Sequence, residues 1–259
     1  MTTYNLFNGL REYHQYIKDY YLHKYAYRAK YLLDVGSASL KSMRFWMKNQ
    51  IQNVFAIEPS EDAFILGTKK LRTLKHPIKI HYIRATGQSN WRNQVAALTK
   101  ESIYPLKLLE NQKFDCITFE FTFHYMLDNT DQLMNNIVSH SRNGTYVVVH
   151  ILDGTKVMWA IEKYKGRYSV RLNNETVYEL KKVGDRKISV YMKGAQGLDN
   201  VIEEYVIEPP ALTKLFESHG YKLLEYKPFA ENLNEEYKLA EYEFKVSEMY
   251  ITYVFQYDV

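Results

Sequence analysis

The stretch YLLDVGSASLKS, residues 31–42, joins a short apolar run to a turn of small residues. The run Tyr31–Val35 is typical of a buried strand in a parallel sheet. Asp34 lies near its end, and Gly36 and Ser37 begin a turn in which the backbone can pass close to a ligand. In an open α/β sheet, ligands bind in the crevice outside the carboxyl ends of the strands. The stretch therefore predicts a strand, a turn and a helix beside a binding crevice, with an ordinary strand-turn-helix junction as the alternative.

Apolar runs and helical patterns alternate over the first 150 residues. Further short strands are expected at Val54–Ile57, Ile80–Ile83, Cys116–Phe119 and Tyr146–His150. Helices are expected over Tyr4–Tyr27, around Met43–Met47, from Ser60 to about Lys70, over much of Ser89–Lys113, and from Thr130 to Ser141. Alternation of this kind predicts an α/β protein with a doubly wound, Rossmann-like parallel sheet.

After His150 the pattern changes to short alternating runs separated by turn residues. Asn173-Asn174 and Gly184-Asp185 are hairpin signals. We therefore expect residues 165–208 to form an antiparallel β insertion over the ligand end of the sheet.

The last part of the chain is expected to close the sheet. A helix over Pro210–His219 is stopped by Gly220, and Lys222–Tyr226 and Tyr250–Tyr257 follow as an antiparallel pair. Residues 1–259 are interpreted as a single domain whose first 30 residues form a helical segment.

The composition indicates a globular protein, because 46% of its 259 residues are hydrophobic and 25% are charged. The single cysteine, Cys116, excludes an internal disulfide and a cysteine-rich metal site. No apolar run is long enough to span a membrane and polar residues follow Met1, so a cytoplasmic protein is expected. The net charge of +4 permits a polyanionic partner, and the 24 tyrosines suit stacking on a nucleobase as well as packing in the core.

An acidic residue follows the second predicted strand. Glu58 comes 24 residues after Asp34, and an acid at this point of a doubly wound sheet can accept hydrogen bonds from ribose hydroxyls. The turn lacks the G-x-G-x-x-G of dinucleotide-binding enzymes, and no Walker-type motif occurs. S-adenosylmethionine (SAM) is a nucleoside without a pyrophosphate, so the pattern favours SAM as the cofactor.

A second group of candidate site residues lies in FEFTFHYMLDN, Phe119–Asn129, at the end of the fourth predicted strand and directly after it. It faces the same crevice as Asp34. His124 and Tyr125 are adjacent, so we expect their rings to point differently and to hold a planar substrate between them.

This segment resembles the F-x-x-HY signature of mRNA cap guanine-N7 methyltransferases, and four other stretches resemble the family in the same order. They are Leu10–Lys18, which resembles R-x-F-N-N-W-(I/M)-K; Leu33–Gly36 followed by Trp46, which resembles the SAM-binding turn; Glu204–Ile207 followed by Leu212, Gly220 and Phe229; and the closing strand Tyr250–Tyr257. Together these stretches cover nearly the whole chain.

The resemblance implies a class I SAM-dependent methyltransferase that acts on the cap guanine without a general base or a metal. The residues implied to bind SAM are Lys18, Asp34, Gly36, Ser37, Glu58, Gln88, Glu120 and Phe121. Those implied to bind the substrate are His14, His124, Tyr125, Glu204 and one closing tyrosine, Tyr250 or Tyr253. Spacing alone leaves the choice between the two tyrosines open.

The chain departs from the family pattern at several positions. Ala38 and Leu40 stand where the turn has glycines, and Leu152 stands near a family proline. The family acid near the adenine is absent from Arg84–Gln88, so Gln88 or backbone amides would have to read the adenine. Two alternatives therefore remain: a methyltransferase acting on another RNA or a small molecule, and a degenerate fold that serves as a binding subunit.

The expected partner is 5′-capped RNA. The chain has no K-x-D-G motif for nucleotidyl transfer. It is therefore expected to act within, or together with, a larger capping enzyme that carries triphosphatase and guanylyltransferase activities. The expected location is the cytoplasm, or the host cytoplasm or virion if the protein is viral.

Overall fold

The computed structural model describes residues 6–73, 77–89, 91, 111–194, 201–233 and 236–259. Most of the helical connection expected between Ser89 and Lys113 lies outside these residues. In the described part of the chain, no helix is long and apolar enough to cross a membrane.

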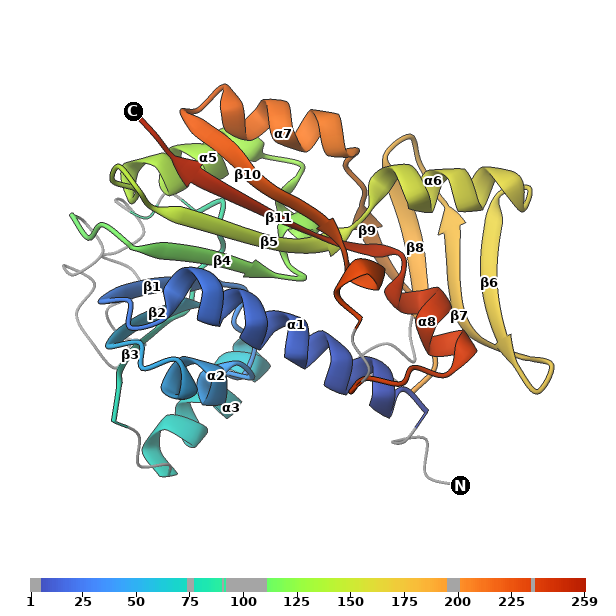
Figure 1. The fold of residues 1–259 in the computed structure, drawn as a ribbon, viewed down its shortest axis with the longest axis horizontal. Helices are drawn as coiled ribbons and strands as arrows, with labels where there is room; N and C mark the ends of the chain where they lie inside the picture. Colours follow the sequence, from blue (N-terminus) through green and yellow to red (C-terminus); the bar gives the residue numbers. More distant parts are fainter. Residues whose placement is uncertain (1–5, 74–76, 90, 92–110, 195–200, 234–235) are drawn as a thin grey trace.

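The centre of the molecule is a seven-stranded sheet in the order β10-β11-β5-β4-β1-β2-β3 (Figure 1). Its strands are β1 (Tyr31–Val35), β2 (Asn53–Ile57), β3 (Lys79–Ile83), β4 (Cys116–Glu120), β5 (Tyr146–Leu152), β10 (Tyr221–Pro228) and β11 (Tyr250–Tyr257). Strand β11 runs antiparallel to both of its neighbours, whereas the strands from β5 to β3 pair in parallel. The predicted doubly wound sheet with an antiparallel closing pair is therefore confirmed.

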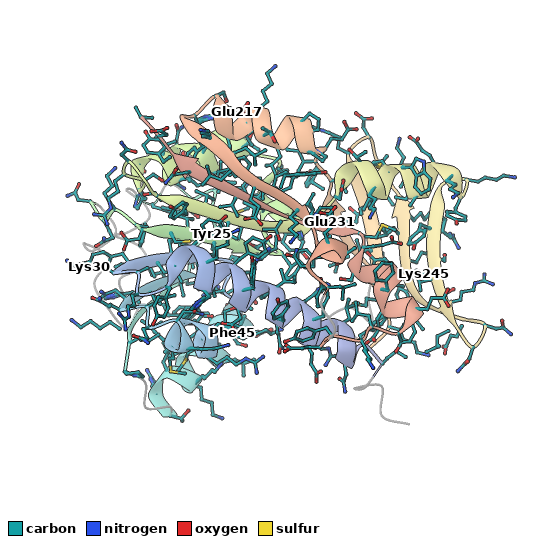
Figure 2. The ribbon with its side chains drawn as sticks, in the orientation of Figure 1. Tyr25, Lys30, Phe45, Glu217, Glu231 and Lys245 are labelled. Carbon is teal, nitrogen blue, oxygen red and sulfur yellow. The ribbon has the colours of Figure 1, made fainter. Side chains whose placement is uncertain are left out.

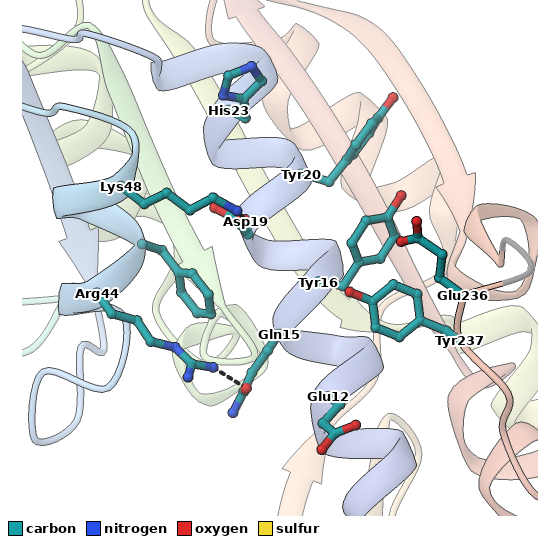
Figure 3. Close-up of a pocket in the computed structure, with 11 residues that line it drawn as sticks. Glu12, Gln15, Tyr16, Asp19, Tyr20, His23, Arg44, Lys48, Glu236 and Tyr237 are labelled. Carbon is teal, nitrogen blue, oxygen red and sulfur yellow. Dashed lines mark hydrogen bonds and ion pairs between the residues drawn. The ribbon is translucent and has the colours of Figure 1, made fainter.

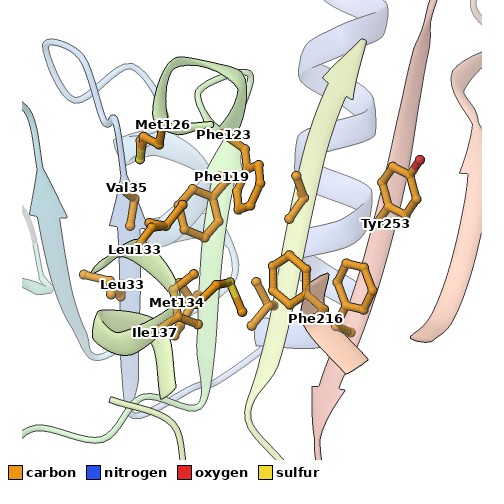
Figure 4. Close-up of a cluster of buried hydrophobic side chains, with 14 of the residues drawn as sticks. Leu33, Val35, Phe119, Phe123, Met126, Leu133, Met134, Ile137, Phe216 and Tyr253 are labelled. Atoms are coloured by element: carbon orange, nitrogen blue, oxygen red, sulfur yellow. The ribbon is translucent and has the colours of Figure 1, made fainter. Parts of the chain in front are cut away.

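Helices cover both faces of this sheet (Figure 1). They are α1 (Asn8–Ala26), α2 (Met43–Lys48) and α3 (Glu61–Thr73) on one face, and α5 (Thr130–Ser139) and α7 (Pro209–Glu217) on the other. Successive side chains of a strand point to opposite faces, so Leu33 and Val35 pack with α5 while Leu32 packs toward α1 and α2. Figure 4 shows the cluster around Leu33 and Phe216. Burial on both faces explains why the strands are almost continuously apolar.

A second sheet extends the molecule beyond the carboxyl ends of the parallel strands (Figure 1). Its four antiparallel strands are β6 (Arg167–Leu172), β7 (Glu175–Lys182), β8 (Lys187–Met192) and β9 (Ile202–Tyr205). Asn173 and Asn174 have φ of +50° and +64°, as a tight hairpin turn requires. The predicted antiparallel insertion is confirmed.

Two helices that the sequence patterns did not indicate pack against this second sheet. They are α6 (Gly154–Lys163) and α8 (Glu241–Ser247), and together with the sheet they enclose a separate apolar cluster. Charged side chains such as Glu217 on α7 and Lys245 on α8 lie at the periphery of the molecule (Figure 2). Short 3₁₀ helices follow β4 (η3, Phe123–Met126) and β10 (η4, Phe229–Asn232).

Hydrogen bonds hold helix α1 along its length to segments 200 or more residues later in the chain. The Leu10 amide donates a 3.0 Å hydrogen bond to the buried carboxylate of Glu243, and the Tyr13 hydroxyl donates to the Phe229 carbonyl. Glu225 on β10 accepts hydrogen bonds from three side chains of the last turns, Tyr21, Lys24 and Tyr25. These contacts fix α1 across the sheet.

Replacing Glu243 with alanine is expected to lower the free energy of unfolding by about 1–3 kcal/mol, because buried amides lose a charged partner. The carboxylate accepts from the first turn of α1 and from the Ala240 amide, 3.1 Å away. The N-cap residue of α1, Phe7, makes no side-chain cap hydrogen bond, and the first turn contains no acid. Urea denaturation of this variant measures the loss. The control is Glu241→Ala, which removes an exposed acid of α8, the helix that carries Glu243, and should leave the midpoint nearly unchanged. Equal midpoints for the two variants would contradict the assignment.

Candidate functional site

The turn after β1 folds back onto the end of β2. The amides of Gly36 and Ser37 both donate to the Ile57 carbonyl, at 2.8 and 2.9 Å. Ala38 and Leu40 have φ of +47° and +57°, a left-handed conformation that normally favours glycine. These are the two positions at which the family resemblance expects glycine, and both adopt a conformation that glycine would adopt more easily.

Hydrogen bonds from neighbouring elements hold this turn in place. Lys70 on α3 donates to the Leu40 carbonyl at 2.7 Å, and the Tyr82 hydroxyl on β3 donates to the Ala38 carbonyl. A side chain in the left-handed region costs about 1–2 kcal/mol per residue. The surrounding elements therefore stabilise a conformation that the residues themselves disfavour.

Glu58 lies at the carboxyl end of β2, where the sequence predicts a ribose-binding acid. It is 7% exposed, and its two oxygens accept from the amides of Ala38 and Ser60, at 2.7 and 2.8 Å. A carboxylate oxygen has a second lone pair, so both can still accept from a hydroxyl. The geometry fits the expected role.

Two further carboxylates are buried beside the turn. Asp34 is 1% exposed and accepts a 2.8 Å hydrogen bond from the Thr118 hydroxyl. Glu120, at the end of β4, accepts from the Ser42 hydroxyl and forms a 2.9 Å ion pair with Lys18. Burial and then the charge of Glu120 raise the pKa of Asp34 well above its usual range. Asp34 therefore retains its proton more readily than an exposed acid does, and a cationic ligand bound beside it would favour its ionised form.

Aromatic side chains form a floor next to Glu120. The His14 ring stacks on Phe121 with centroids 5.3 Å apart, and Tyr250 meets His14 edge-on at 5.1 Å. The Lys18 ammonium lies 5.1 Å from the centre of the Phe121 ring. Of the two closing tyrosines, Tyr250 lies here, whereas Tyr253 is 1% exposed within the core.

Gln88 lies in the loop after β3, with its side-chain amide already bonded. It donates to the Met126 carbonyl at 3.1 Å and to the Asp128 carboxylate. Asp128 thus brings an acid to the place where the family acid is missing. Asn136 on α5 fixes the same loop by donating to the carbonyls of Gly87 and Ser89, at 2.8 and 2.7 Å. Sequence reasoning missed Asp128 and Asn136, because each reaches this loop only through the folding of the chain.

A second polar group gathers where η3 meets β9. The Tyr125 hydroxyl donates to Glu204 at 3.1 Å, and the His124 ring nitrogen Nε2 lies 3.5 Å from the other Glu204 oxygen. The His124 and Tyr125 rings are only 4.0 Å apart, so the expectation that a planar substrate fits between them is wrong. Both residues lie on one 3₁₀ turn and face the same carboxylate instead.

Burial controls the charges of this group. His124 is 3% exposed and Glu204 is 8% exposed. Burial raises the pKa of Glu204 to about 7, against the hydrogen bond from Tyr125, and lowers the pKa of His124 to about 3. Neither His124 ring nitrogen has a hydrogen-bond partner among the described residues. Near neutral pH the group therefore contains an ionisable carboxylate beside a neutral, buried imidazole whose N–H has no partner among the described residues.

A separate groove of about 580 Å³ lies along α1, between α2 and the segment containing Tyr237 (Figure 3). Its two cationic side chains already have partners: Lys48 pairs with Asp19, and Arg44 donates to Gln15. The groove contains none of the residues that the sequence assigns to the cofactor or the substrate. We therefore do not assign the candidate site to it.

The fold is similar to those of solved methyltransferases, although no protein-family model matches the chain. The CcbJ methyltransferase from Streptomyces caelestis has a TM-score of 0.64 at 14% identity, over 99% of this chain and 95% of that one. A SAM-dependent methyltransferase from Clostridium acetobutylicum ATCC 824 has a TM-score of 0.59 at 13% identity, over 98% and 92%. The SAM-bound CalS10 from Micromonospora echinaspora, an amino pentose methyltransferase, has a TM-score of 0.55 at 12% identity, over 95% and 91%. The chain thus has the class I SAM-dependent methyltransferase fold, with an added antiparallel sheet.

Proposed function

We propose that this protein is a SAM-dependent methyltransferase that methylates guanine N7 of the 5′ mRNA cap, GpppN-RNA. The observation that carries the proposal is the buried Glu204 carboxylate, with Tyr125 on one oxygen and an unpartnered His124 beside the other. Guanine presents N1–H and N2–H₂ as donors and O6 as an acceptor. Glu204 complements the two donors and the His124 N–H complements O6, whereas adenine presents no such pair of donors.

The residues around the β1 turn fit SAM as the cofactor. Glu58 would accept from the ribose hydroxyls, and the buried acids Asp34 and Glu120 suit a ligand that carries a sulfonium and an ammonium, which would favour their ionised forms. Lys18, which pairs with Glu120 here, would meet the methionine carboxylate, and Gln88 in the loop after β3 would read the adenine. When bound, SAM supplies an activated methyl group on a good leaving group.

The protein's part in the reaction is alignment. Guanine N7 has a free lone pair and no proton, so no side chain has to act as a general base. Glu204 and His124 orient the base, which is catalysis by proximity and orientation. As N7 gains positive charge, the aromatic faces of Tyr250 and Phe121 favour the charged ring.

The motifs of the chain add support to this assignment. Within the cap methyltransferases, they most resemble the methyltransferase domain of the large multifunctional capping enzyme of African swine fever virus. We therefore propose that capped RNA is the partner, and that triphosphatase and guanylyltransferase activities come from the same capping system. A viral origin and a cytoplasmic location belong to this proposal.

The test is methyl transfer from labelled SAM to GpppA- and GpppG-capped RNA, followed by nuclease digestion to identify the methylated atom. Label on guanine N7 supports the proposal. Label on another atom or another acceptor supports a methyltransferase of different specificity. SAM and cap binding without transfer supports a binding subunit.

The ionisation of Glu204 predicts that GpppA binding strengthens with rising pH. A pKa near 7 leaves the carboxylate mostly protonated at pH 6 and mostly ionised at pH 8, so the affinity for GpppA should rise by about tenfold between these two pH values. The contribution of Glu204 to folding stability has the opposite sign. The folded state holds this proton above the usual pKa of 4.5, so the free energy of unfolding falls as pH rises toward 7. Calorimetric titration at both pH values checks this, with Glu204→Gln as the control that should show no such rise. An equal rise in the control would assign it to another group.

A further inference from the structure

A cavity of about 550 Å³ opens between α1 and the turn after β1. Three cationic side chains line it, Arg11 and Lys18 on α1 and Lys41 in the turn, and no acidic residue is among the described residues that line it. The aromatic floor of His14, Phe121 and Tyr250 lines it as well. Cationic walls around an aromatic floor suit a ligand that is both aromatic and anionic.

The three cations differ in their partners. Lys18 is held by Glu120 in a 2.9 Å ion pair. The side chains of Arg11 and Lys41 are exposed and have no hydrogen bond or ion pair with any residue that the structure describes. Two unpaired cations on different elements therefore face one cavity. In the groove of Figure 3, by contrast, Lys48 is paired with an acid.

The cavity adjoins the group around Glu204. Tyr250 lines the cavity and packs on the same apolar cluster as Ile202 of β9, the strand that carries Glu204. A nucleotide whose base meets Glu204 can therefore extend past Tyr250 into the cavity. Its phosphates then meet Arg11 and Lys41.

We propose that Arg11 and Lys41 form a phosphate subsite that holds the triphosphate bridge of a capped substrate. This inference rests on the proposed function for the identity of the ligand. Arg11 offers a fork of N–H donors that matches phosphate oxygens, and Lys41 offers a mobile point charge on the opposite element. Together they neutralise phosphates that would otherwise repel the carboxylates beneath the cavity.

The test compares binding of GpppA, inorganic tripolyphosphate and guanosine to the full chain. The variants are Arg11→Gln and Lys41→Gln, with Arg171→Gln and Lys222→Gln as controls that remove exposed cations elsewhere. We expect each cavity variant to weaken GpppA and tripolyphosphate binding by about tenfold, as loss of one charged hydrogen bond does, and to leave guanosine binding unchanged. The salt dependence of GpppA binding should also become weaker.

Equal binding of tripolyphosphate and GpppA by all four variants, or no binding of tripolyphosphate by the unmodified protein, would overturn the subsite. Failure of the proposed function looks different. In that case ApppA binds as tightly as GpppA and Glu204→Gln changes neither, while the cavity variants still weaken tripolyphosphate binding.

Discussion

Replacing Glu204 with alanine is expected to lower methylation of GpppA by about 100-fold or more, the effect of losing a charged hydrogen bond of about 3 kcal/mol. The carboxylate is buried and already oriented by Tyr125 at 3.1 Å, so little reorganisation is needed when a base replaces solvent. A site built to accept from guanine N1–H and N2–H₂ loses both contacts in the variant. His124 alone cannot then distinguish guanine from other bases. Affinity for SAM should stay within a few-fold, because Glu204 lies on β9, away from the β1 turn.

Glu203 supplies a matched control, because the neighbouring side chain of a strand points to the other face. It is exposed and pairs with Lys187 at 2.5 Å, so Glu203→Ala should be mild. Steady-state methylation by both variants, with SAM binding measured in parallel, tests the assignment. Equal activities, or a Glu204 variant that loses SAM binding first, would contradict it.

Replacing Gly36 with alanine is expected to lower the free energy of unfolding by about 3 kcal/mol, through strain and overpacking together. Gly36 has φ of +82°, and a Cβ there would lie 2.3 Å from the Thr122 side chain. Thr122 cannot move away easily, because its hydroxyl donates to the Val35 carbonyl at 2.6 Å. The variant should also lose SAM affinity, since the β1 turn must separate from the loop after β4.

Gly144→Ala is a control that distinguishes the cost of backbone strain from the cost of side-chain crowding. It has φ of +88°, close to that of Gly36, but a Cβ there meets nothing within 4 Å. Gly144→Ala should therefore cost only the backbone strain, about 1 kcal/mol. Urea denaturation of both variants measures the difference. If the two variants lose the same stability, crowding of the added Cβ against Thr122 is not the reason that position 36 requires glycine.

The sheet was predictable because its signals are local. Runs such as Tyr31–Val35 are apolar at nearly every position, which only a strand covered on both faces requires. The hairpin at Asn173-Asn174 was predictable for a similar reason, since these residues tolerate positive φ. The polar residues expected at strand ends, including Glu58 and Glu120, do lie beside the turn after β1, where they accept hydrogen bonds from Ala38 and Ser42.

The partners of those residues were not predictable, because they come from distant parts of the chain. The pairing of Lys18 with Glu120 joins α1 to β4, and Asn136 reaches the loop after β3 from α5. Helix α8 is only seven residues long, which is too short for an apolar period to be recognised in the sequence. The relation between His124 and Tyr125 depends on the 3₁₀ turn, which adjacent positions in a sequence do not reveal.

Because α1 is held by late segments of the chain, its contacts can form only near the end of protein synthesis. This helix carries Lys18 and His14, yet its hydrogen-bond partners at Glu225, Phe229 and Glu243 are translated more than 200 residues later. Contacts of such long range form late, because a long loop must close before they stabilise anything. A nascent chain that ends before Glu225 therefore exposes the apolar face of its first helix to solvent and chaperones. The cavity that Lys18 and His14 line together with Tyr250 of β11 is complete only once the last strands have joined the sheet.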